Sequence, residues 1–420
     1  MRRRLVIAGV AAALAAATFL FGGIAGRGGD AAPAPAATAL GGAPASLAQL
    51  QTEVRRQPSS RGYALLGLAY EQRARETGDA SYYTRAAGVL RRADANDPIA
   101  VVARGSLALS RHGFRHALAL GNRAVSLAPG SARGYGIRGD ALLELGRYAD
   151  AFRTFDTMVS LRPGASSYAR VSYARELRGD VGGAIAAMRL ALDAAQGQPE
   201  PYAWTAVQLG KLHWGIGEQA AAAFWYRAAL RVVPGYVYAL DALAQVEAAR
   251  GRLAEAIAVE RRAAEAVPQP QFVATLGDLY TVVGNRRAAR RQYELVGAIA
   301  RILRTNGVRT DLEATAFAVD HGIALPRTIA AARAARAERP SIDGDDVLAW
   351  ALARNGRCAE ALPWSRRALR LGTRDATKLF HRGMIERCLG RPGARSWFRR
   401  ALELNPHFSL LWSPVARRYA

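Results

Sequence analysis

Lysine, cysteine and aromatic residues are all scarce in this sequence of 420 residues. Only Lys211 and Lys378 are lysines, so 58 − 2 = 56 of the basic residues are arginine, a bias that with the abundant alanine is typical of a GC-rich bacterial genome. The arginines are spread along the chain, so the net charge of +24 does not predict a nucleic-acid partner. Aromatic residues make up 8%, which excludes an all-β fold, and two cysteines exclude a disulfide-rich scaffold.

Motifs for catalysis and for metal or cofactor binding are also missing. There is no GxGxxG after a strand, no phosphate-binding GxxxxGK[ST], no GxSxG and no CxxC. His112 and His116 are four residues apart, but a helix turn is expected between them, so they should not share a face. Asp343, Asp345 and Asp346 lack the downstream glutamate of a calcium loop, and aspartate favours helix starts. We therefore expect no enzyme, metal site, cofactor or small-molecule substrate.

The N-terminal segment has the pattern of a membrane-targeting signal. Three arginines at positions 2–4 precede residues 5–24, which carry no charge and just reach the ~20 residues that cross a bilayer. Residues 1–27 are expected to be a membrane anchor or a cleaved signal peptide, with the rest of the chain outside the cytoplasm. The predicted location is the cell membrane, or secreted after cleavage. Residues 28–46, rich in Ala, Pro and Gly, are expected to form a linker.

A repeat begins after this linker. Ten glycines follow an apolar helical run and precede the restart of a second one: Gly78, Gly113, Gly146, Gly179, Gly217, Gly251, Gly284, Gly322, Gly356 and Gly390. Their spacings are 35, 33, 33, 38, 34, 33, 38, 34 and 34 residues. Pairs of alanines seven residues apart, such as Ala222 and Ala229, place small side chains on one helix face, and a proline closes many units. The pattern predicts helix pairs that must stack to bury their apolar faces.

These residues resemble the tetratricopeptide repeat family, whose unit of 34 residues has a turn glycine, two small positions in its second helix and a final proline. The best copies are residues 132–165 and 203–236. The resemblance implies an all-α, right-handed α-solenoid of about ten stacked helix-turn-helix repeats over residues 60–406. We expect a leading helix over residues 47–59 and a C-terminal cap over residues 407–420, because the end repeats of a solenoid must be covered.

Three units depart from the pattern. The first has an insertion around residues 73–79, and the tenth is one residue short. The eighth has Arg327 where a small residue is expected, and Pro326 is predicted to lie inside its second helix and to kink the solenoid there.

In this family the first helix of each unit lines a concave groove, so the resemblance implies binding of a peptide or protein element there. Transferring the family's positions gives Arg133, Asp140, Arg170, Tyr173, Trp204, Gln208, Lys211, Trp214, Tyr238, Asp241, Gln245 and Asp278. Two alternatives stay open, that the aromatic members pack inside the repeats and that the charged members form an ordinary solvated face. The asparagine of the family's clamp for chaperone tails is missing.

The sequence therefore favours a non-catalytic scaffold on the extracytoplasmic side of the membrane that binds a protein partner. The alternative is a cytoplasmic regulatory tetratricopeptide repeat module that controls a partner protein.

Cys358 and Cys388 lie in consecutive repeats. Counted from the turn glycines, Cys358 begins a second helix and Cys388 ends the first helix of the next unit. If these helices are antiparallel and adjacent, the Cα atoms come within the ~7 Å that a disulfide needs. The alternative is two buried thiols.

Overall fold

The computed structural model describes residues 46–420. The predicted anchor or signal peptide and nearly all of the linker lie outside the described residues. Within residues 46–420, no helix combines the length and the apolar character that crossing a bilayer requires.

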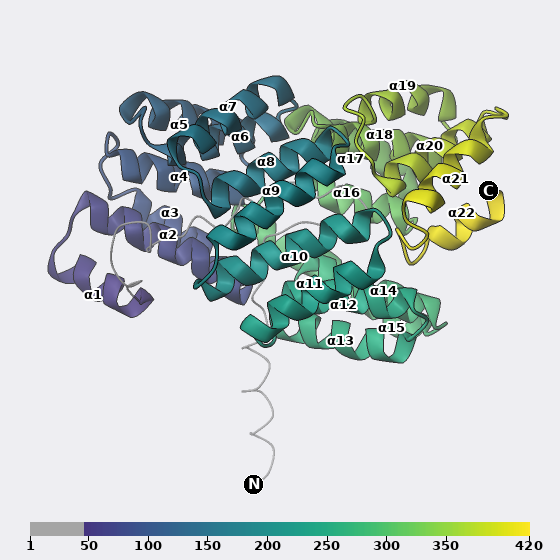
Figure 1. Cartoon of the computed structure of the whole chain (residues 1–420), viewed down its shortest axis with the longest axis horizontal. Helices are drawn as coiled ribbons and strands as arrows, with labels where there is room; N and C mark the ends of the chain where they lie inside the picture. The colour runs from purple at the N-terminus through teal and green to yellow at the C-terminus, as the bar shows by residue number, and fades with distance from the viewer. Residues whose placement is uncertain (1–45) are drawn as a thin grey trace, which may run out of the picture.

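The described chain is an all-α repeat solenoid, as predicted, and residues 46–420 contain no strand. The helices are α1 (Leu47–Arg56), α2 (Ser60–Thr77), α3 (Ser81–Leu90), α4 (Pro98–Ser110), α5 (Phe114–Leu127), α6 (Ala132–Glu144), α7 (Tyr148–Leu161), α8 (Ala165–Leu177), α9 (Val181–Ala194), α10 (Pro199–Gly215), α11 (Gln219–Val232), α12 (Val237–Ala249), α13 (Leu253–Ala266), α14 (Pro270–Val282), α15 (Arg286–Thr305), α16 (Asp311–Asp320), α17 (Leu325–Glu338), α18 (Ile342–Arg354), α19 (Cys358–Ala368), α20 (Ala376–Cys388), α21 (Ala394–Leu404) and α22 (Ser413–Tyr419). Figure 1 shows the purple first helices at one end of the long axis and the yellow last helices at the other.

Helices α2 to α21 form ten pairs, which we call units 1 to 10, and α2 and α3 form unit 1. Each predicted turn glycine lies between the two helices of its unit. Nine of these glycines have φ between 66° and 79°, the left-handed region that favours glycine. The exception is unit 2, where His112 adopts φ 56° and Gly113 has φ −86°. Histidine occupies the left-handed region there because its ring is anchored by a hydrogen bond described below.

The irregular spacings are absorbed mainly by longer helices. Helix α2 has 18 residues, α10 has 17 and α15 has 20, whereas α4, α6 and α8 have 13 each. The predicted kink in unit 8 is wrong, because α17 begins at Leu325 and Pro326 therefore lies in its first turn. Proline is tolerated at that position, where the backbone N–H has no partner within the helix.

Close helix packing within a unit depends on one glycine of the first helix. Gly139 faces the ring of Phe155, and Gly210 faces the ring of Tyr226, so that a Cβ at either glycine would overlap the ring. Both rings are buried. A small residue here lets a large ring of the second helix lie against the first helix's backbone.

The solenoid turns fully around its axis and stacks on itself. The turn inside a unit is contacted by the loop that follows the unit five places later, through residues 191 to 197 positions apart. Units 2 to 5 show this contact, and we call their turns the covered turns. The four hydrogen bonds run from His112 Nδ1 to the Arg309 carbonyl (2.7 Å), from Ile342 N–H to the Tyr148 hydroxyl (2.7 Å), from Thr373 Oγ1 to the Leu177 carbonyl (2.5 Å) and from Asn405 Nδ2 to the Trp214 carbonyl (2.8 Å).

Candidate functional site

The twelve predicted groove residues all lie on the first helices of units 3 to 7, which are α6, α8, α10, α12 and α14. None of them is exposed: Arg170, Asp241 and Asp278 are buried and the other nine are half-buried. Nine of the twelve residues keep some exposure, so a contact surface for a partner at these positions stays a prediction.

Arg170 is the first of the buried members. Its guanidinium donates from Nε and Nη2 to the two carboxylate oxygens of Asp140, at 2.8 and 2.6 Å, and from Nη1 to the Ser166 hydroxyl at 2.5 Å. This bidentate ion pair joins unit 3 to unit 4. Arg170 and Asp140 are thus structural partners of each other.

Asp241 is completely buried and lies between α12 and α14. Its carboxylate accepts hydrogen bonds from Gln271 Nε2 at 2.9 Å, Thr275 Oγ1 at 3.3 Å and Gln245 Nε2 at 3.4 Å. Burial raises its pKa to about 6, although the charge of Lys211 opposes the rise. Burial, and then the neighbouring Asp241, also hold the pKa of Glu260 well above its usual range. Asp241 fastens one unit to the next and has no surface to offer a partner.

Asp278 reaches the interior with a carboxylate that is held by two neighbours. Its Oδ1 accepts from the Tyr293 hydroxyl at 2.8 Å and lies 2.8 Å from His321 Nε2. Burial lowers the pKa of His321, but the hydrogen bond and charge of Asp278 outweigh burial and leave that pKa raised. The two hydrogen bonds therefore fix the orientation of the Asp278 carboxyl group at the wall of the cavity.

A cavity of about 320 Å³ opens beside Asp278. Trp214, Gln245 and Asp278, three of the predicted groove residues, line one side of it, together with Gln271 and Thr275. The opposite side comes from the C-terminal cap, with residues 407–410 and 413–414 and Arg417. The cavity thus lies between the middle of the solenoid and its own C-terminus, and it is partly open to solvent.

Sequence reasoning missed this contribution of the cap to the site. It predicted a cover for the last repeat, and Phe408 does pack on Phe380 of unit 10. Phe408, Leu410 and Pro414 also face the first helices of units 6 and 7 across the cavity. The available signal was the group of large apolar residues Phe408, Leu410, Leu411 and Trp412.

Some of the remaining predicted residues pack inside the solenoid, and for the others contact with a partner is not tested. Gln269 Nε2 donates to the Tyr238 hydroxyl at 2.9 Å, and the ring of Tyr238 meets Phe272 edge to face, which favours the packing alternative. Burial raises the pKa of Tyr173 and lowers that of Arg133. Contact of Trp204, Gln208 and Lys211 with a partner stays a prediction.

Charged groups are concentrated where the later units meet the covered turns. Arg339, 6% exposed, forms ion pairs with Glu144 of unit 3 and with Glu313 of unit 8, the latter at 2.7 Å. Burial lowers the pKa of Arg339, but the two carboxylates outweigh burial and raise it. A buried cation shared by two units and a loop makes the stacking specific to this register.

The three aspartates at the start of α18 are engaged in ion pairs. Asp343 lies 2.8 Å from Lys378 Nζ, and Asp346 lies 3.0 Å from His381 Nδ1. Asp345 accepts from Arg336 at 3.0 Å and from Arg370 at 2.6 Å. Ser341, rather than an aspartate, caps the helix through a hydrogen bond from Gly344 N–H. Among residues 46–420 no group of His, Cys, Asp and Glu is arranged to hold a metal ion.

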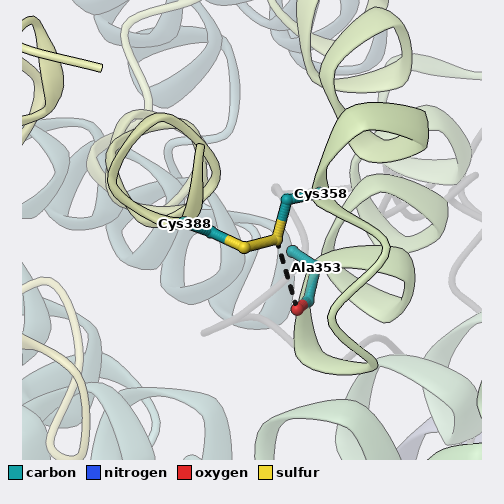
Figure 2. Close-up of a disulfide and its surroundings, with 3 residues drawn as sticks. All are labelled: Ala353, Cys358 and Cys388. Atoms are coloured by element: carbon teal, nitrogen blue, oxygen red, sulfur yellow. Dashed lines mark hydrogen bonds between the residues drawn. A yellow bond between two sulfur atoms is a disulfide. The ribbon is translucent and has the colours of Figure 1, made fainter. Parts of the chain in front are cut away.

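Cys358 and Cys388 are joined by a disulfide, with their Cα atoms 6.2 Å apart. Figure 2 shows the bridge between the start of α19 and the end of α20, the placement obtained by counting from the turn glycines. The Cys358 sulfur also lies 3.8 Å from the Ala353 carbonyl oxygen. The bridge ties unit 9 to unit 10, whose loops cover units 4 and 5.

A model of the tetratricopeptide repeat family matches residues 102–166 and 207–269. No curated protein matches the chain. Among solved structures, the human IFIT1 dimer with PPP-AAAA is 14% identical, with 86% of this chain and 94% of that chain covered and a TM-score of 0.47. PilW, a widely conserved type IV pilus biogenesis factor, is 17% identical, with 50% and 97% covered and a TM-score of 0.41. Pseudomonas aeruginosa PilF is 15% identical, with 46% and 88% covered and a TM-score of 0.39.

Proposed function

We propose that this chain, in which a model of the tetratricopeptide repeat family matches two stretches, is a non-catalytic scaffold that binds a protein partner on the extracytoplasmic side of a bacterial membrane. Tetratricopeptide repeat proteins are in general scaffolds for protein interactions. The cavity between the solenoid and the C-terminal cap is the proposed entry point for a partner's side chain.

The observation that supports binding is the lining of this cavity. An aromatic ring, Trp214, lies beside two side-chain amides and the fixed carboxylate of Asp278. Aromatic residues that are half-buried against polar neighbours supply much of the binding energy at protein interfaces. The cavity is large enough for one bulky side chain, so we propose that the partner inserts an anchor residue there.

Two features support the extracytoplasmic side. A disulfide such as Cys358–Cys388 persists in oxidising compartments and is reduced in the cytosol. The arginines and the uncharged run at the start of the sequence have the pattern of an export or anchor signal. Protease added to spheroplasts should therefore degrade the solenoid, and thiol counting on denatured, non-reduced protein should find no free thiol.

Cross-linking mass spectrometry on the native envelope tests the scaffold itself. We expect a recurrent protein partner whose cross-links map to helices α10, α12, α14 and the cap. Trp214→Ala should lower the yield of this cross-link about tenfold or more, since a hot-spot truncation costs about 2 kcal/mol. Trp225→Ala, in the second helix of the same unit, is the matched control and should leave the yield unchanged.

Other results would contradict the proposal. An equal loss in both tryptophan variants would assign the effect to unit 5 as a whole rather than to the cavity. Full protection of the solenoid in spheroplasts, together with two free thiols, would favour the cytoplasmic regulatory module instead.

A further inference from the structure

The stacking that covers units 2 to 5 stops abruptly at unit 6. A Cβ built on Gly146 or Gly179 would overlap the loop carbonyl of Pro340 or Gly372, and one on Gly217 would lie 3.1 Å from the Leu404 carbonyl. Nothing lies within 4 Å of the same point at Gly251 in unit 6 or Gly284 in unit 7. We call the turns of units 6 and 7, residues 249–253 and 282–287, the bare edge.

The bare edge is where the next layer of the solenoid would rest. The covering loops come after units 7, 8, 9 and 10 in order, so the turns of units 6 and 7 would be covered by loops after an eleventh and a twelfth unit. Residues 46–420 contain no such units, and the C-terminal cap faces the unit 6 turn across the cavity. The turn glycines of units 9 and 10, Gly356 and Gly390, are equally open, but the turns of units 6 and 7 are the ones that also line the cavity.

The side chains of the bare edge are apolar and positive. Val282 and Val283 are 42% and 44% exposed, whereas the residues at these positions in the covered turn of unit 3, Glu144 and Leu145, are buried and half-buried. Arg286, Arg287 and Arg291 follow at the start of α15, are exposed, and have no ion pair recorded among the described residues. Arginines at the positive end of a helix dipole repel one another and the helix, and a bound anion relieves both repulsions.

The cavity continues from the bare edge into the interior. The bare edge and the cavity share four lining residues, which are Ala249, Gly251, Leu253 and Val282. A segment that lies on the bare edge can therefore place a side chain in the cavity. The cavity wall at this end is mainly apolar, which suits an apolar anchor residue rather than a second charge.

We infer that the bare edge is the docking surface for an acidic segment of a partner protein, which lies on units 6 and 7 as the next layer of the superhelix and inserts one apolar side chain into the cavity. This inference rests on the proposed scaffold function and adds the chemistry and position of the partner. The arginines without an ion pair predict that the segment is acidic. The loops that contact the equivalent turns of units 2 to 5 predict that it is a polypeptide.

Panning the full chain against a displayed library of random 16-residue peptides tests this chemistry. The enriched peptides should carry net negative charge and at least one large apolar residue. Their affinity should fall about tenfold or more for the triple variant Arg286→Glu, Arg287→Glu, Arg291→Glu, and should weaken with salt. The variant should fold, because acidic residues are favourable in the first turns of a helix. The control is Arg189→Glu, Arg395→Glu, Arg399→Glu, which reverses three exposed arginines elsewhere and should retain binding.

Each other outcome overturns the inference. Neutral or basic enriched peptides, or acidic ones that bind both triple variants equally, would exclude the bare edge. Arginine-dependent binding to vesicles of phosphatidylglycerol in place of peptide would identify a lipid surface, and arginine-dependent dimerisation in sedimentation velocity would identify a second copy. Trp214-dependent peptides that ignore the arginines would overturn this inference alone, whereas the lack of any envelope partner would remove the proposed function itself.

Discussion

The covered turns and the bare edge are built from the same repeat, yet they differ in what surrounds them. At the covered turns, backbone and charged side chains of the later units meet the earlier ones, as Arg339 meets Glu144. At the bare edge, the equivalent glycines face open space and valines are exposed. Repeat sequence alone therefore does not decide whether a turn is an internal contact or an available surface. Contact with a later unit within residues 46–420 decides.

The largest expected effect comes from removing the buried cation that holds a covered turn. Arg339→Met leaves Glu144 and Glu313 without their shared partner and should cost about 3–5 kcal/mol of unfolding free energy. Arg286→Met at the bare edge should change it by less than about 0.5 kcal/mol. Urea unfolding of both variants measures the difference, and similar losses would mean that the covering contacts add no stability.

The disulfide tests whether the last layer depends on being tied together. Cys358→Ser with Cys388→Ser should cost roughly 3–4 kcal/mol, from the entropy of opening a loop of 30 residues. Because the loop after unit 10 covers unit 5, hydrogen exchange should also rise near Trp214. Exchange at the turn of unit 7 serves as the internal control and should not change. Unchanged exchange near Trp214 would show that the cover stays in place without the bridge.

The sequence predicted the units well because a turn glycine is a local requirement. A left-handed turn needs glycine at the same place in each unit, so the ten positions could be counted without knowledge of distant contacts. The disulfide could be anticipated for the same reason, since its two cysteines lie in neighbouring units at positions fixed by that count.

The interior could not be predicted in this way. Whether Asp241 faces a groove or a neighbour depends on the rotation from one unit to the next, and a small rotation summed over five units brings residues about 194 positions apart into contact. Family positions placed Arg170 in an open groove, but its partner Asp140 and the closure of the superhelix bury it. The cap was missed as a wall of the cavity because its partners lie in units 6 and 7, far away in the sequence.

Measuring unfolding stability as a function of pH extends the comparison to a buried carboxyl group outside the covered turns. Glu71 of unit 1 is 1% exposed and accepts from the Ser106 hydroxyl at 2.7 Å, but among residues 46–420 no arginine donates a hydrogen bond to it as Arg339 does to Glu144. Burial raises its pKa from 4.5 to about 7. The folded-state pKa lies above the unfolded value, so its contribution to stability is full below about pH 4.5 and is lost as the pH rises through about 7. The loss amounts to at most about 3 kcal/mol by linkage.

Glu71→Gln should therefore flatten the fall in stability between pH 5 and pH 8, measured by urea unfolding at each pH. The glutamine keeps the shape and an acceptor for Ser106, and it removes the charge. A wild-type chain whose stability is constant across this range, or a variant that falls as steeply as the wild type, would show that Glu71 is not the group that titrates.

The smallest expected effect compares the two classes of turn directly, with one substitution at two matched glycines. Gly179 and Gly284 have φ of 77° and 78°, so alanine meets the same left-handed strain at both, about 1 kcal/mol. At Gly179 the new Cβ also overlaps the Gly372 carbonyl and must displace a backbone segment, whereas at Gly284 it meets open space. Gly179→Ala should thus be less stable than Gly284→Ala by a further 1–3 kcal/mol or so, the usual range for overpacking. Urea unfolding of the two variants measures this difference, because the backbone strain is the same in both and cancels. Equal destabilisation would mean that the loop after unit 9 yields freely, and that a covered turn is no more tightly bound than a bare one.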